Sequence, residues 1–521
     1  MRVARPRSRR GVVLLVVLIV IVLLTLAAYR YNDWMLGEAR ATESVIRSTQ
    51  ARAFATSGVH YAAALLAAGP NAAGGSLFDN PQLFQDIEVP TSATNGRTGR
   101  FSILTLRDPN DSGSNGQAHT FGVTCESGKV NLNALLGLDK GKGEVGKKIL
   151  MQLPNMTDEI ADSILDYIDT DDTARQNGAE NEYYSALDPP YRCKNGPLDT
   201  LEELLLVKGV TPDLLFGSDR NRNGQADPGE GDGQLSLGWQ AYLTVYSREV
   251  NVDPDGKPRI YLNNSDLSTT YTRLQAAVGE EVATYIAAAR LYGTSAVSSS
   301  SSSSTSKSSS ASQDIGAAKA KIQEDVGNAG TKKLRKISSI WDLVSSQVSV
   351  TVGTGRQQKR ITYPSPMNDV ASQRELFPKV WQYCTTSNQM DLTPRLNINT
   401  APQAVLLGLK EAAGLQDSDI ESILGRRPTP GSASEDELYK TPAWLLTELN
   451  LKASLVKKLD PYITTRSQVY SLQSVGYFDK GGPTARVEAV IDTNQGRPRI
   501  VYFRDVSELG KGFDVGNAAS R

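Results

Sequence analysis

The segment "RSRRGVVLLVVLIVIVLLTLAAYR" at residues 7–30 joins a basic stretch to a long apolar one. No charged residue occurs from Val12 to Tyr29, and these 18 residues would form a helix of about 27 Å, close to the bilayer hydrocarbon thickness of about 30 Å. The segment is therefore expected to cross a membrane once, with its basic side in the cytoplasm and the bulk of the chain on the far side. The basic side holds the arginines Arg2, Arg5, Arg7, Arg9 and Arg10.

Three kinds of membrane segment begin in this way. A secretory signal peptide usually has a shorter apolar core that ends in an A-x-A site, and the best match here is Thr25-x-Ala27. A permanent anchor needs no cleavage site. A basic leader that ends in glycine directly before the apolar helix resembles the leader of type IV pilin-like proteins, which prepilin peptidase cuts after the glycine. Cleavage between Gly11 and Val12 is therefore predicted, although Val16 stands where those proteins usually carry glutamate.

The apolar segment is expected to continue as one long helix. No proline occurs between Pro6 and Pro70, and apolar or small residues recur at steps of three and four after the membrane segment. A helix from Val12 to about Leu66 would be roughly 80 Å long. Glycines at 37 and 58 each cost about 1 kcal/mol against alanine, so the alternative is a membrane helix joined by a break to a separate helix.

Composition excludes several functions. The chain has 521 residues, which suggests two to four domains, and its net charge is -1. Without the five leader arginines, 51 basic residues face 57 acidic ones, so nucleic acid is not an expected partner. With only His60 and His119, a histidine metal cluster or catalytic triad is not expected. The three cysteines form no disulfide framework, although one bridge between Cys125 and Cys193 is conceivable in an oxidising compartment.

Two parts of the chain look like strands, and they lie far apart in the sequence. Short runs with period-two character occur between residues 70 and 130, such as "RFSILTL", and again near the C-terminus, such as "ARVEAVIDT" and "RPRIVYFRDV". Helical patterns dominate between them. We therefore expect an α+β fold in which a long N-terminal helix packs on an antiparallel sheet and a large, mostly helical domain is inserted in that sheet. The expected parts are the leader 1–11, the helix 12–68, the first β part 69–130, the insertion 131–465 and the second β part 466–521.

The insertion contains a repeated motif. "KVNLNALL" at 129–136, "RIYLNNSDL" at 259–267 and "RLNINTAPQAVLLGL" at 395–409 are short extended pieces that lead into helices, and Asn side chains suit helix N-termini. Pairs of short helices follow and look like helix hairpins. Helix-hairpin-helix units often bind DNA, but "VKGVTPDLL" has Gly209 without a second turn glycine, and "LDTLEELLLVKG" has three acidic residues to one lysine. A structural role for these hairpins is therefore favoured.

Several segments of the chain resemble the minor pseudopilin K family (general secretion pathway protein K) of the type II secretion system. The resemblance runs from Gly11 to about Phe503 and is most specific in the block at 161–212. The matching segments are "VNLN" after a Glu-Ser-Gly-Lys turn, "ADSILDYIDTDDTARQNGAENEYYSALDPPYRCKNGPLDTLEELLLVKGVTP", "NINTAP" and "YITTRSQVYSL". This family also lacks the glutamate at the fifth mature position, so Val16 becomes an expected feature.

The resemblance implies a function, a location and partners. It implies a pilin-like fold with a helical insertion, and a non-catalytic subunit at the tip of the periplasmic pseudopilus that supports pseudopilus assembly and export of folded proteins. The implied partners are the minor pseudopilins I and J, other pseudopilins, prepilin peptidase and the inner membrane, and methylation is implied as well. The alternative is a permanently anchored envelope protein with a helix-hairpin-helix domain, with a role in DNA uptake.

A serine-rich segment, "TSAVSSSSSSSTSKSSSASQ" at 294–313, departs from a compact version of this family. Such a composition buries little apolar surface, so a disordered linker is predicted. A tolerated surface insertion is favoured over a glycan attachment or partner site.

The acidic block invites two interpretations. Asp162 and Asp166 share a helix face, and paired carboxylates can do acid–base work or hold metal ions, but no nucleophile–base pair, phosphate loop or cofactor motif accompanies them. An enzyme and an organic cofactor are therefore not expected. With the family resemblance counted, a calcium-binding loop is predicted between residues 169 and 180, in addition to the loop at 219–230 described below. A purely structural acidic loop is the alternative. Its candidate ligands are Asp169, Asp171, Asp172 and Glu180.

The main predicted calcium site is the segment "DRNRNGQADPGE" at 219–230. It fits the D-x-[DN]-x-[DN]-G-x5-E pattern of calcium-binding loops at every specified position. Gly224 permits the sharp turn, and weak binding, about 10⁻⁴ to 10⁻³ M as in extracellular modules, is expected. Pro228 and the neighbouring glycines forbid the usual exit helix, and a solvated loop without metal is the alternative. The candidate ligands are Asp219, Asn221, Asn223, Gln225, Asp227 and Glu230.

Overall fold

A computed structural model of the chain describes most of its residues. The leader residues 1–9 and residues 298–307 of the serine-rich segment lie outside the described residues, so predictions that fall on them are untested. The residues described are 10–69, 76–90, 98–107, 119–139, 142–225, 227–230, 235–297, 308–353, 355–428, 437–510 and 512–513.

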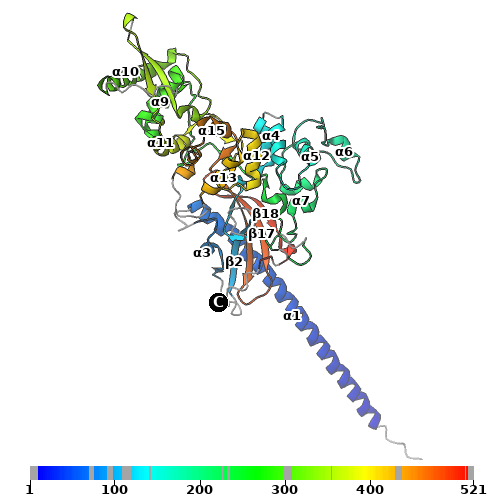
Figure 1. Cartoon of the computed structure of the whole chain (residues 1–521). Coiled ribbons are helices and arrows are strands. Elements are labelled where there is room, and N and C mark those ends of the chain that lie inside the picture. The colour runs from blue at the N-terminus through cyan, green and yellow to red at the C-terminus, as the bar shows by residue number, and fades with distance from the viewer. Residues whose placement is uncertain are drawn as a thin grey trace, which may run out of the picture.

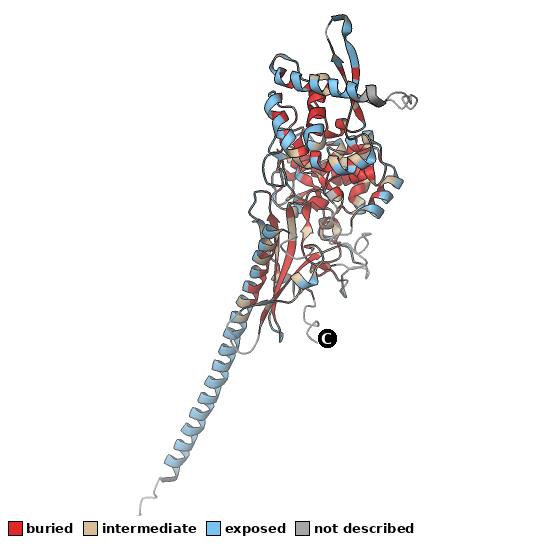
Figure 2. Ribbon diagram, turned by 90° about the vertical axis from the view of Figure 1, so that its left-hand side faces the viewer, coloured by how far each residue is buried: buried red, intermediate tan, exposed pale blue. Residues whose placement is uncertain are grey.

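The N-terminal helix α1 (Arg10–Ala68) is continuous over 59 residues, so the alternative with a break between two helices is wrong. From Val12 to Ile46 the helix is exposed and extends away from the rest of the molecule (Figure 2). Its apolar N-terminal part is long enough to cross a membrane. Nearer the C-terminal end one side is buried, and the buried residues follow the helical period: Ala51, Phe54, Ala55, Val59 and Ala62.

The sheet under α1 combines strands from both ends of the chain. Strand β2 near the N-terminus pairs antiparallel with β16 near the C-terminus, with Phe101 opposite Gly476. The central order is β1-β2-β16-β17-β18, with β3 on β2 and β4 on β16, and all of these pairs are antiparallel. Together with α1 and the helical insertion, this arrangement confirms the predicted fold class. The strands are β1 (Ile87–Val89), β2 (Gly99–Leu106), β3 (His119–Phe121), β4 (Thr124–Cys125), β16 (Val469–Phe478), β17 (Ala485–Asp492) and β18 (Arg499–Asp505); short helix α3 (Pro81–Phe84) precedes β1.

Two glycines let α1 lie directly on the sheet. A Cβ atom on Gly58 of α1 would overlap the Ser474 side chain, and one on Gly476 of β16 would overlap the main chain at Ala51 and Ala55. The propensity cost of Gly58 in the helix is therefore offset by close packing. Beside this contact the rings of Phe54 and Phe478 pack edge to face, with centroids 5.3 Å apart.

The inserted domain gathers at the end of the sheet opposite to the free part of α1 (Figure 1). It contains three copies of one unit, each bounded by a pair of short parallel strands in the same register. The first unit spans β5 (Val130–Asn131) to β6 (Leu243–Thr244). The second spans β8 (Ile260–Tyr261) to β12 (Cys384–Thr385), and the third spans β14 (Leu396–Asn397) to β15 (Ile463–Thr464). The repeated motif seen in the sequence is thus the first strand of each unit.

Asparagine joins the two halves of each unit. The side-chain amides of Asn133, Asn263 and Asn399 donate to the carbonyl oxygens of Leu198, Ile337 and Tyr439, at 2.9, 2.9 and 2.8 Å. Each acceptor lies two residues before a Ser or Thr, and two of these residues, Thr200 and Ser339, cap the 3₁₀ segments that follow them. The contact expected from the sequence, between an asparagine oxygen and a backbone N–H at the start of a turn, is made by other asparagines. The side-chain oxygens of Asn131 and Asn397 accept from the backbone N–H groups of Asn133 and Asn399.

The helices of the three units differ in length and number. The first unit has α4 (Glu144–Leu150), α5 (Asp158–Ile168), α6 (Asn181–Ser185) and α7 (Pro212–Phe216); the second has α8 (Leu267–Val278), α9 (Glu280–Tyr292), α10 (Ser308–Gly327) and α11 (Val370–Tyr383); the third has α12 (Gln403–Ala413), α13 (Asp417–Arg426), α14 (Trp444–Thr447) and α15 (Ala453–Leu459). The 3₁₀ segments are Glu126–Gly128, Leu132–Asp139, Leu201–Leu206, Gly238–Ala241, Ala329–Thr331, Ile340–Leu343, Gly355–Gln357, Glu437–Lys440 and Ser507–Leu509.

The second unit corrects two sequence-based expectations. The disordered linker predicted at 294–313 is too long, because β9 (Ser295–Ala296) pairs with β10 (Ser346–Val352) and α10 begins at Ser308. The buried Ala318, Ile322 and Val326 hold α10, and the helix extends backward from them into the serines. The unit also contains an unexpected hairpin of β10 and β11 (Lys359–Pro364). Two further short strands, β7 (Glu249–Val250) and β13 (Asp391–Leu392), pair between units.

The conceivable disulfide between Cys125 and Cys193 is wrong, because all three cysteines are free and buried. The Cys125 thiol donates to the Ser467 hydroxyl at 2.7 Å, at the base of the sheet. Cys193 instead lies in the first unit, 4.0 Å from the carbonyl oxygen of Asp166.

Candidate cation sites

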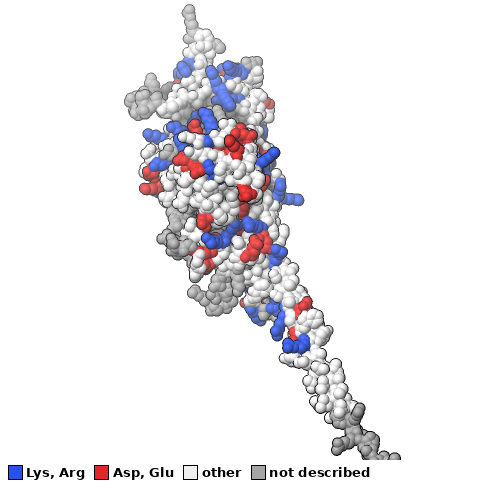
Figure 3. All heavy atoms as spheres, turned by 90° about the vertical axis from the view of Figure 1, so that its right-hand side faces the viewer, with Lys and Arg blue, Asp and Glu red and all other residues white. Residues whose placement is uncertain are grey.

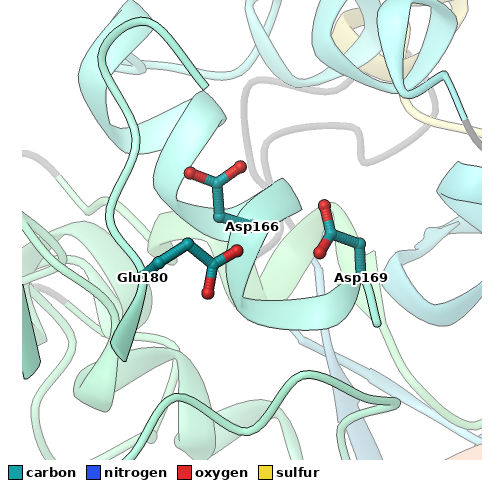
Figure 4. Close-up of side chains that lie close together, drawn as sticks. All are labelled: Asp166, Asp169 and Glu180. Carbon is teal, nitrogen blue, oxygen red and sulfur yellow. The ribbon is translucent and has the colours of Figure 1, made fainter. Parts of the chain in front are cut away.

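Three acidic side chains of the first unit meet at the C-terminal end of α5. Oxygen atoms of Asp166, Asp169 and Glu180 lie within 4.8 Å of one another, and the three residues are 0%, 8% and 4% exposed (Figure 4). Helix α5 begins at Thr157, whose hydroxyl accepts from the Ile160 N–H. The helix ends just before Asp169, which is its C-terminal cap. The cluster therefore joins a helix end to the loop that follows it.

A glycine brings Glu180 to the helix. The loop turns at Arg175 to Gly178, where the Gly178 N–H donates to the Arg175 carbonyl oxygen at 3.1 Å. A Cβ atom on Gly178 would overlap the Asp166 carboxylate, so only glycine fits this approach. Glu180 then points its carboxylate toward Asp166 and Asp169 (Figure 4).

The charges in this cluster are incompletely balanced. The Arg175 guanidinium bonds to Asp166 and, at 2.7 Å, to Asp169. Neither carboxylate oxygen of Glu180 has a hydrogen-bond partner among the described residues. Burial, and then the charges of Asp166 and Asp169, raise the pKa of Glu180 to about 7. Three carboxylates facing one guanidinium suit a hard divalent cation, which prefers several oxygen ligands.

The cluster differs in part from the set predicted between 169 and 180. Asp169 and Glu180 are brought together, but Asp171 accepts from the Thr173 N–H at 2.9 Å and Asp172 from the Asn195 side-chain amide, also at 2.9 Å. Both of these aspartates are exposed and lie in turn contacts. Asp166 was assigned only to an acidic helix face. Its position one turn before Asp169 was the sequence signal that could have placed it here.

The second candidate site, at 219–230, folds back on itself. Asp219 is fully buried, and its carboxylate accepts from the N–H groups of Asn223 and Gly224 at 2.9 and 2.8 Å. Gly224 has a φ of 67°, the left-handed conformation predicted for the sharp turn. The side-chain amides of Asn221 and Asn223 both donate to Asp227, at 2.7 Å each.

Glu230 closes this loop. One of its carboxylate oxygens accepts from the Asn221 N–H at 3.3 Å, and the other is buried without a partner among the described residues. Gln225 is exposed, and its N–H donates to the Asn223 side chain at 2.7 Å. The six predicted ligand residues thus lie around one turn, with residues 226 and 231–234 outside the described residues.

The loop at 219–230 is attached to the sheet. Arg486 of β17, which is fully buried, donates to the carbonyl oxygens of Asn221 and Arg222 at 2.9 and 2.6 Å. Arg222 in turn pairs with Glu488 of the same strand at 2.7 Å. The loop therefore fixes the first unit of the insertion against the sheet, a contact that sequence patterns do not reveal.

The acidic cluster lies within a recognised domain. The family model described as Type II secretion system (T2SS), protein K, matches residues 128–216, which run from just before β5 to the end of α7. Residues 128–216 are therefore similar to type II secretion system protein K. The matched segment contains the cluster of Asp166, Asp169 and Glu180, whereas the loop at 219–230 follows it directly.

Curated relatives match a similar length of chain. A putative type II secretion system protein K from Escherichia coli (strain K12) is 45% identical over 58 residues, which is 11% of this chain and 18% of the relative. Type II secretion system protein K from Pectobacterium carotovorum subsp. carotovorum is 36% identical over 74 residues, which is 14% of this chain and 23% of the relative. Each match thus spans about a fifth of the protein K relative.

A solved structure aligns over a greater length. It is the crystal structure of the GspK-GspI-GspJ complex from the enterotoxigenic Escherichia coli type 2 secretion system. The alignment covers 89% of this chain and 99% of that one, with 12% identity and a TM-score of 0.36.

Proposed function

We propose that the chain is a minor pseudopilin of a type II secretion system, a non-catalytic subunit that supports pseudopilus assembly and the export of folded proteins across the outer membrane. The observation that carries this proposal is the presence, in one chain, of a protein K domain and a helix α1 that packs on a sheet at one end only. The exposed apolar part of α1 has to be covered by lipid or by other subunits.

The precursor is proposed to insert first into the inner membrane. The arginine leader stays in the cytoplasm, α1 crosses the membrane once, and the sheet and insertion lie in the periplasm. Prepilin peptidase then cuts between Gly11 and Val12, and α1 is later extracted into the pseudopilus. The support for this order is the uninterrupted apolar helix directly after the arginine leader.

A position at the tip is proposed on two grounds. In pilin-like fibres the glutamate at the fifth mature position would neutralise the N-terminal amine of a neighbouring subunit in a medium where an unpaired charge is costly, and Val16 supplies no carboxylate. A subunit with no subunit above it can do without that carboxylate. The bulk of the three inserted units would also be hard to repeat along a narrow fibre (Figure 1). Minor pseudopilins I and J are the proposed neighbours, with other pseudopilins below.

Calcium is the proposed ligand of both acidic sites. Glu180 and Glu230 each have at least one buried carboxylate oxygen without a partner among the described residues, and both lie within groups of oxygen-bearing side chains. Calcium takes six to eight such oxygens and tolerates irregular geometry. In the cluster at α5, Arg175 would have to move away from Asp166 and Asp169. The proposed role of the ion is to order the loops.

Nucleic acid is not a proposed partner. On the face drawn in Figure 3, Lys and Arg are interspersed with Asp and Glu, and the described charges form no broad area of one sign. Binding to phosphates would require clustered basic side chains.

Labelled electron microscopy of pseudopili tests the proposed position. The full chain, carrying a label at the exposed Gln358 in the connection between β10 and β11, is expected at one end of each pseudopilus. It is also expected to co-purify with minor pseudopilins I and J. Label at regular intervals along the fibre would contradict a tip position. Retention of the chain in the membrane without any pseudopilin partner would contradict the pseudopilin assignment and favour a permanent anchor.

A further inference from the structure

Each unit of the insertion has a basic residue directly before its first strand. These residues are Lys129, Arg259 and Arg395, and the shared strand register gives each an equivalent threonine in the partner strand, namely Thr244, Thr385 and Thr464. The three units can therefore be compared position by position.

In the first and third units a buried carboxylate joins these two residues. Glu126, 3% exposed, bonds to Lys129 at 3.0 Å and accepts from the Thr244 hydroxyl. Glu249, 4% exposed, binds Arg395 with both oxygens, one of them at 2.8 Å from Nε, and lies 3.4 Å from the Thr464 hydroxyl. The same arrangement thus occurs twice, with glutamates supplied from different parts of the chain.

The second unit has the basic residue and the threonine without the carboxylate. Arg259 is 7% exposed, and its Nε and Nη2 atoms have no hydrogen-bond partner among the described residues. The Thr385 hydroxyl donates only to the Ser387 carbonyl oxygen, at 3.3 Å. Buried guanidinium N–H groups without hydrogen-bond partners are costly, because burial removes their water.

The surroundings of Arg259 add more positive charge. The guanidinium carbons of Arg259, Arg466 and Arg395 lie 5.0, 5.4 and 5.9 Å from the centroid of the buried Trp381 ring. Arg395 is neutralised by Glu249, whereas Arg466 donates to the carbonyl oxygens of Val252 and Gln382. Burial and the charges of Arg466 and Arg395 lower the pKa of Arg259 to about 9, against the opposing charge of Glu249, which is bonded to Arg395.

We propose that the second unit binds a small anion at the Arg259 guanidinium, beside Trp381, where the other two units use a glutamate. The chemical class is a halide or an oxyanion no larger than phosphate or acetate, since the guanidinium is almost completely buried. The anion would complete the charge balance of Arg259 and Arg466 and hold β8 to β12. This binding is independent of the proposed role in secretion.

Iodide provides a direct probe, because an iodide ion bound next to Trp381 quenches its fluorescence. The full-length protein in detergent is titrated with iodide at constant ionic strength, with the bulky anion gluconate as background. A saturable quenching component is expected, and it should be displaced by chloride, phosphate or acetate in the order of their affinities. At about ten times Kd the preferred anion should raise Tm by about 1 °C.

Three variants decide the assignment. Arg259→Met and Trp381→Phe should both remove the saturable component. Arg248→Met is the control, because it changes an exposed arginine that pairs with Asp391 of β13. This variant should retain the saturable quenching component. Quenching that is linear in all variants, or saturable quenching that survives Arg259→Met, would overturn the proposal.

A crystal of the wild-type protein grown in bromide gives a test that needs no variant to fold. An anomalous peak within hydrogen-bond distance of Arg259 Nε or Nη2 is expected. The main competing partner is the Asn251 side chain, whose buried oxygen also has no partner among the described residues. Asn251 lies close to Arg259, because its backbone carbonyl oxygen accepts from the Arg259 backbone N–H at 3.2 Å. A structure in which Arg259 bonds only to Asn251 or to water would refute the anion site.

Discussion

Arg486 in β17 donates a hydrogen bond through Nη2 to the carbonyl oxygen of Arg222, at 2.6 Å, and so joins the sheet to the loop at 219–230. The same guanidinium also reaches the Asn221 carbonyl and the Gln473 side chain, at 2.9 Å each. One fully buried residue therefore fixes the inserted domain relative to the sheet and α1.

Replacing this arginine should weaken both parts. Arg486→Met is expected to cost about 3 kcal/mol of stability, because it leaves three acceptors without their donor, two of them in buried contacts. Chemical denaturation of the full chain in detergent measures this cost, and Arg499→Met is the control because Arg499 is an exposed residue at the sheet edge. Equal stability of the two variants would show that the contact is not an anchor.

The acidic cluster at α5 gives a prediction in which the sign depends on calcium. In EDTA, Glu180→Gln should leave Tm unchanged or raise it, because the variant removes an unpartnered carboxylate that faces Asp166 and Asp169. In millimolar calcium the same variant should lose much of the calcium-dependent rise in Tm.

The loop at 219–230 is tested in the same assay. Asp219→Ala combined with Glu230→Ala should remove its share of the calcium-dependent rise, and changing both sites should remove all of it. Asp171→Asn is the control, because the exposed Asp171 carboxylate contacts, among the described residues, only the nearby Thr173 N–H. A wild-type protein whose melting and protease resistance do not change in millimolar calcium would exclude calcium at both sites.

The buried Glu126 predicts a loss of stability in acid. Burial alone would raise the pKa of this carboxyl, but the Lys129 charge and the hydroxyl groups of Ser471 and Thr244 outweigh burial, and its pKa lies below the usual value. The unfolded chain therefore binds the proton more readily, so the stabilisation is present above the unfolded pKa of about 4.5 and is lost as pH falls through the folded pKa.

Glu126→Gln should flatten this part of the pH profile and destabilise the protein at pH 7 by about 3 kcal/mol, since Lys129 loses its buried partner. Thermal unfolding between pH 3 and 7 measures both effects, and the exposed Glu88→Gln is the control. An unchanged slope in Glu126→Gln would mean that another group controls acid unfolding.

The space around two glycines predicts opposite effects of their substitution by alanine: one lies in the contact between α1 and the sheet, and the other is exposed. Gly476→Ala should destabilise the protein by about 2 kcal/mol, because the added methyl group meets the main chain of α1. Gly316→Ala, in α10 with open space around it, should be neutral or stabilising by up to about 1 kcal/mol. A neutral Gly476→Ala would show that α1 can shift without cost.

The general fold was predictable because its signals are local. The apolar period of α1 and the alternating strands at both ends of the chain are visible in short windows of sequence. The hairpin of β10 and β11 was missed although Val348 and Val350 alternate with polar residues, because it lies inside a segment dominated by helical patterns. The start of α10 was missed because helix extension into the serines depends on buried residues further along the chain.

The candidate sites were predictable only where ligands are close in sequence. The loop at 219–230 follows a local pattern, and its six residues do lie around one turn. The cluster of Asp166 with Glu180 depends on the approach allowed by Gly178, and the loop residues that Arg486 binds, Asn221 and Arg222, lie more than 260 residues away from it. The missing glutamate at Arg259 became visible only when the three strand pairs could be superposed by their register.

The most direct test of the pseudopilin proposal is the intact mass and N-terminal sequence of the protein made in a cell that contains prepilin peptidase. We predict a mature chain that begins at Val12 with "VVLLVVLIV", and a full-length precursor when Gly11 is replaced by a bulky residue. A mature chain that begins near Ala28 would establish a conventional signal peptide and contradict the proposal, and an uncut chain in the wild type would establish a permanent anchor.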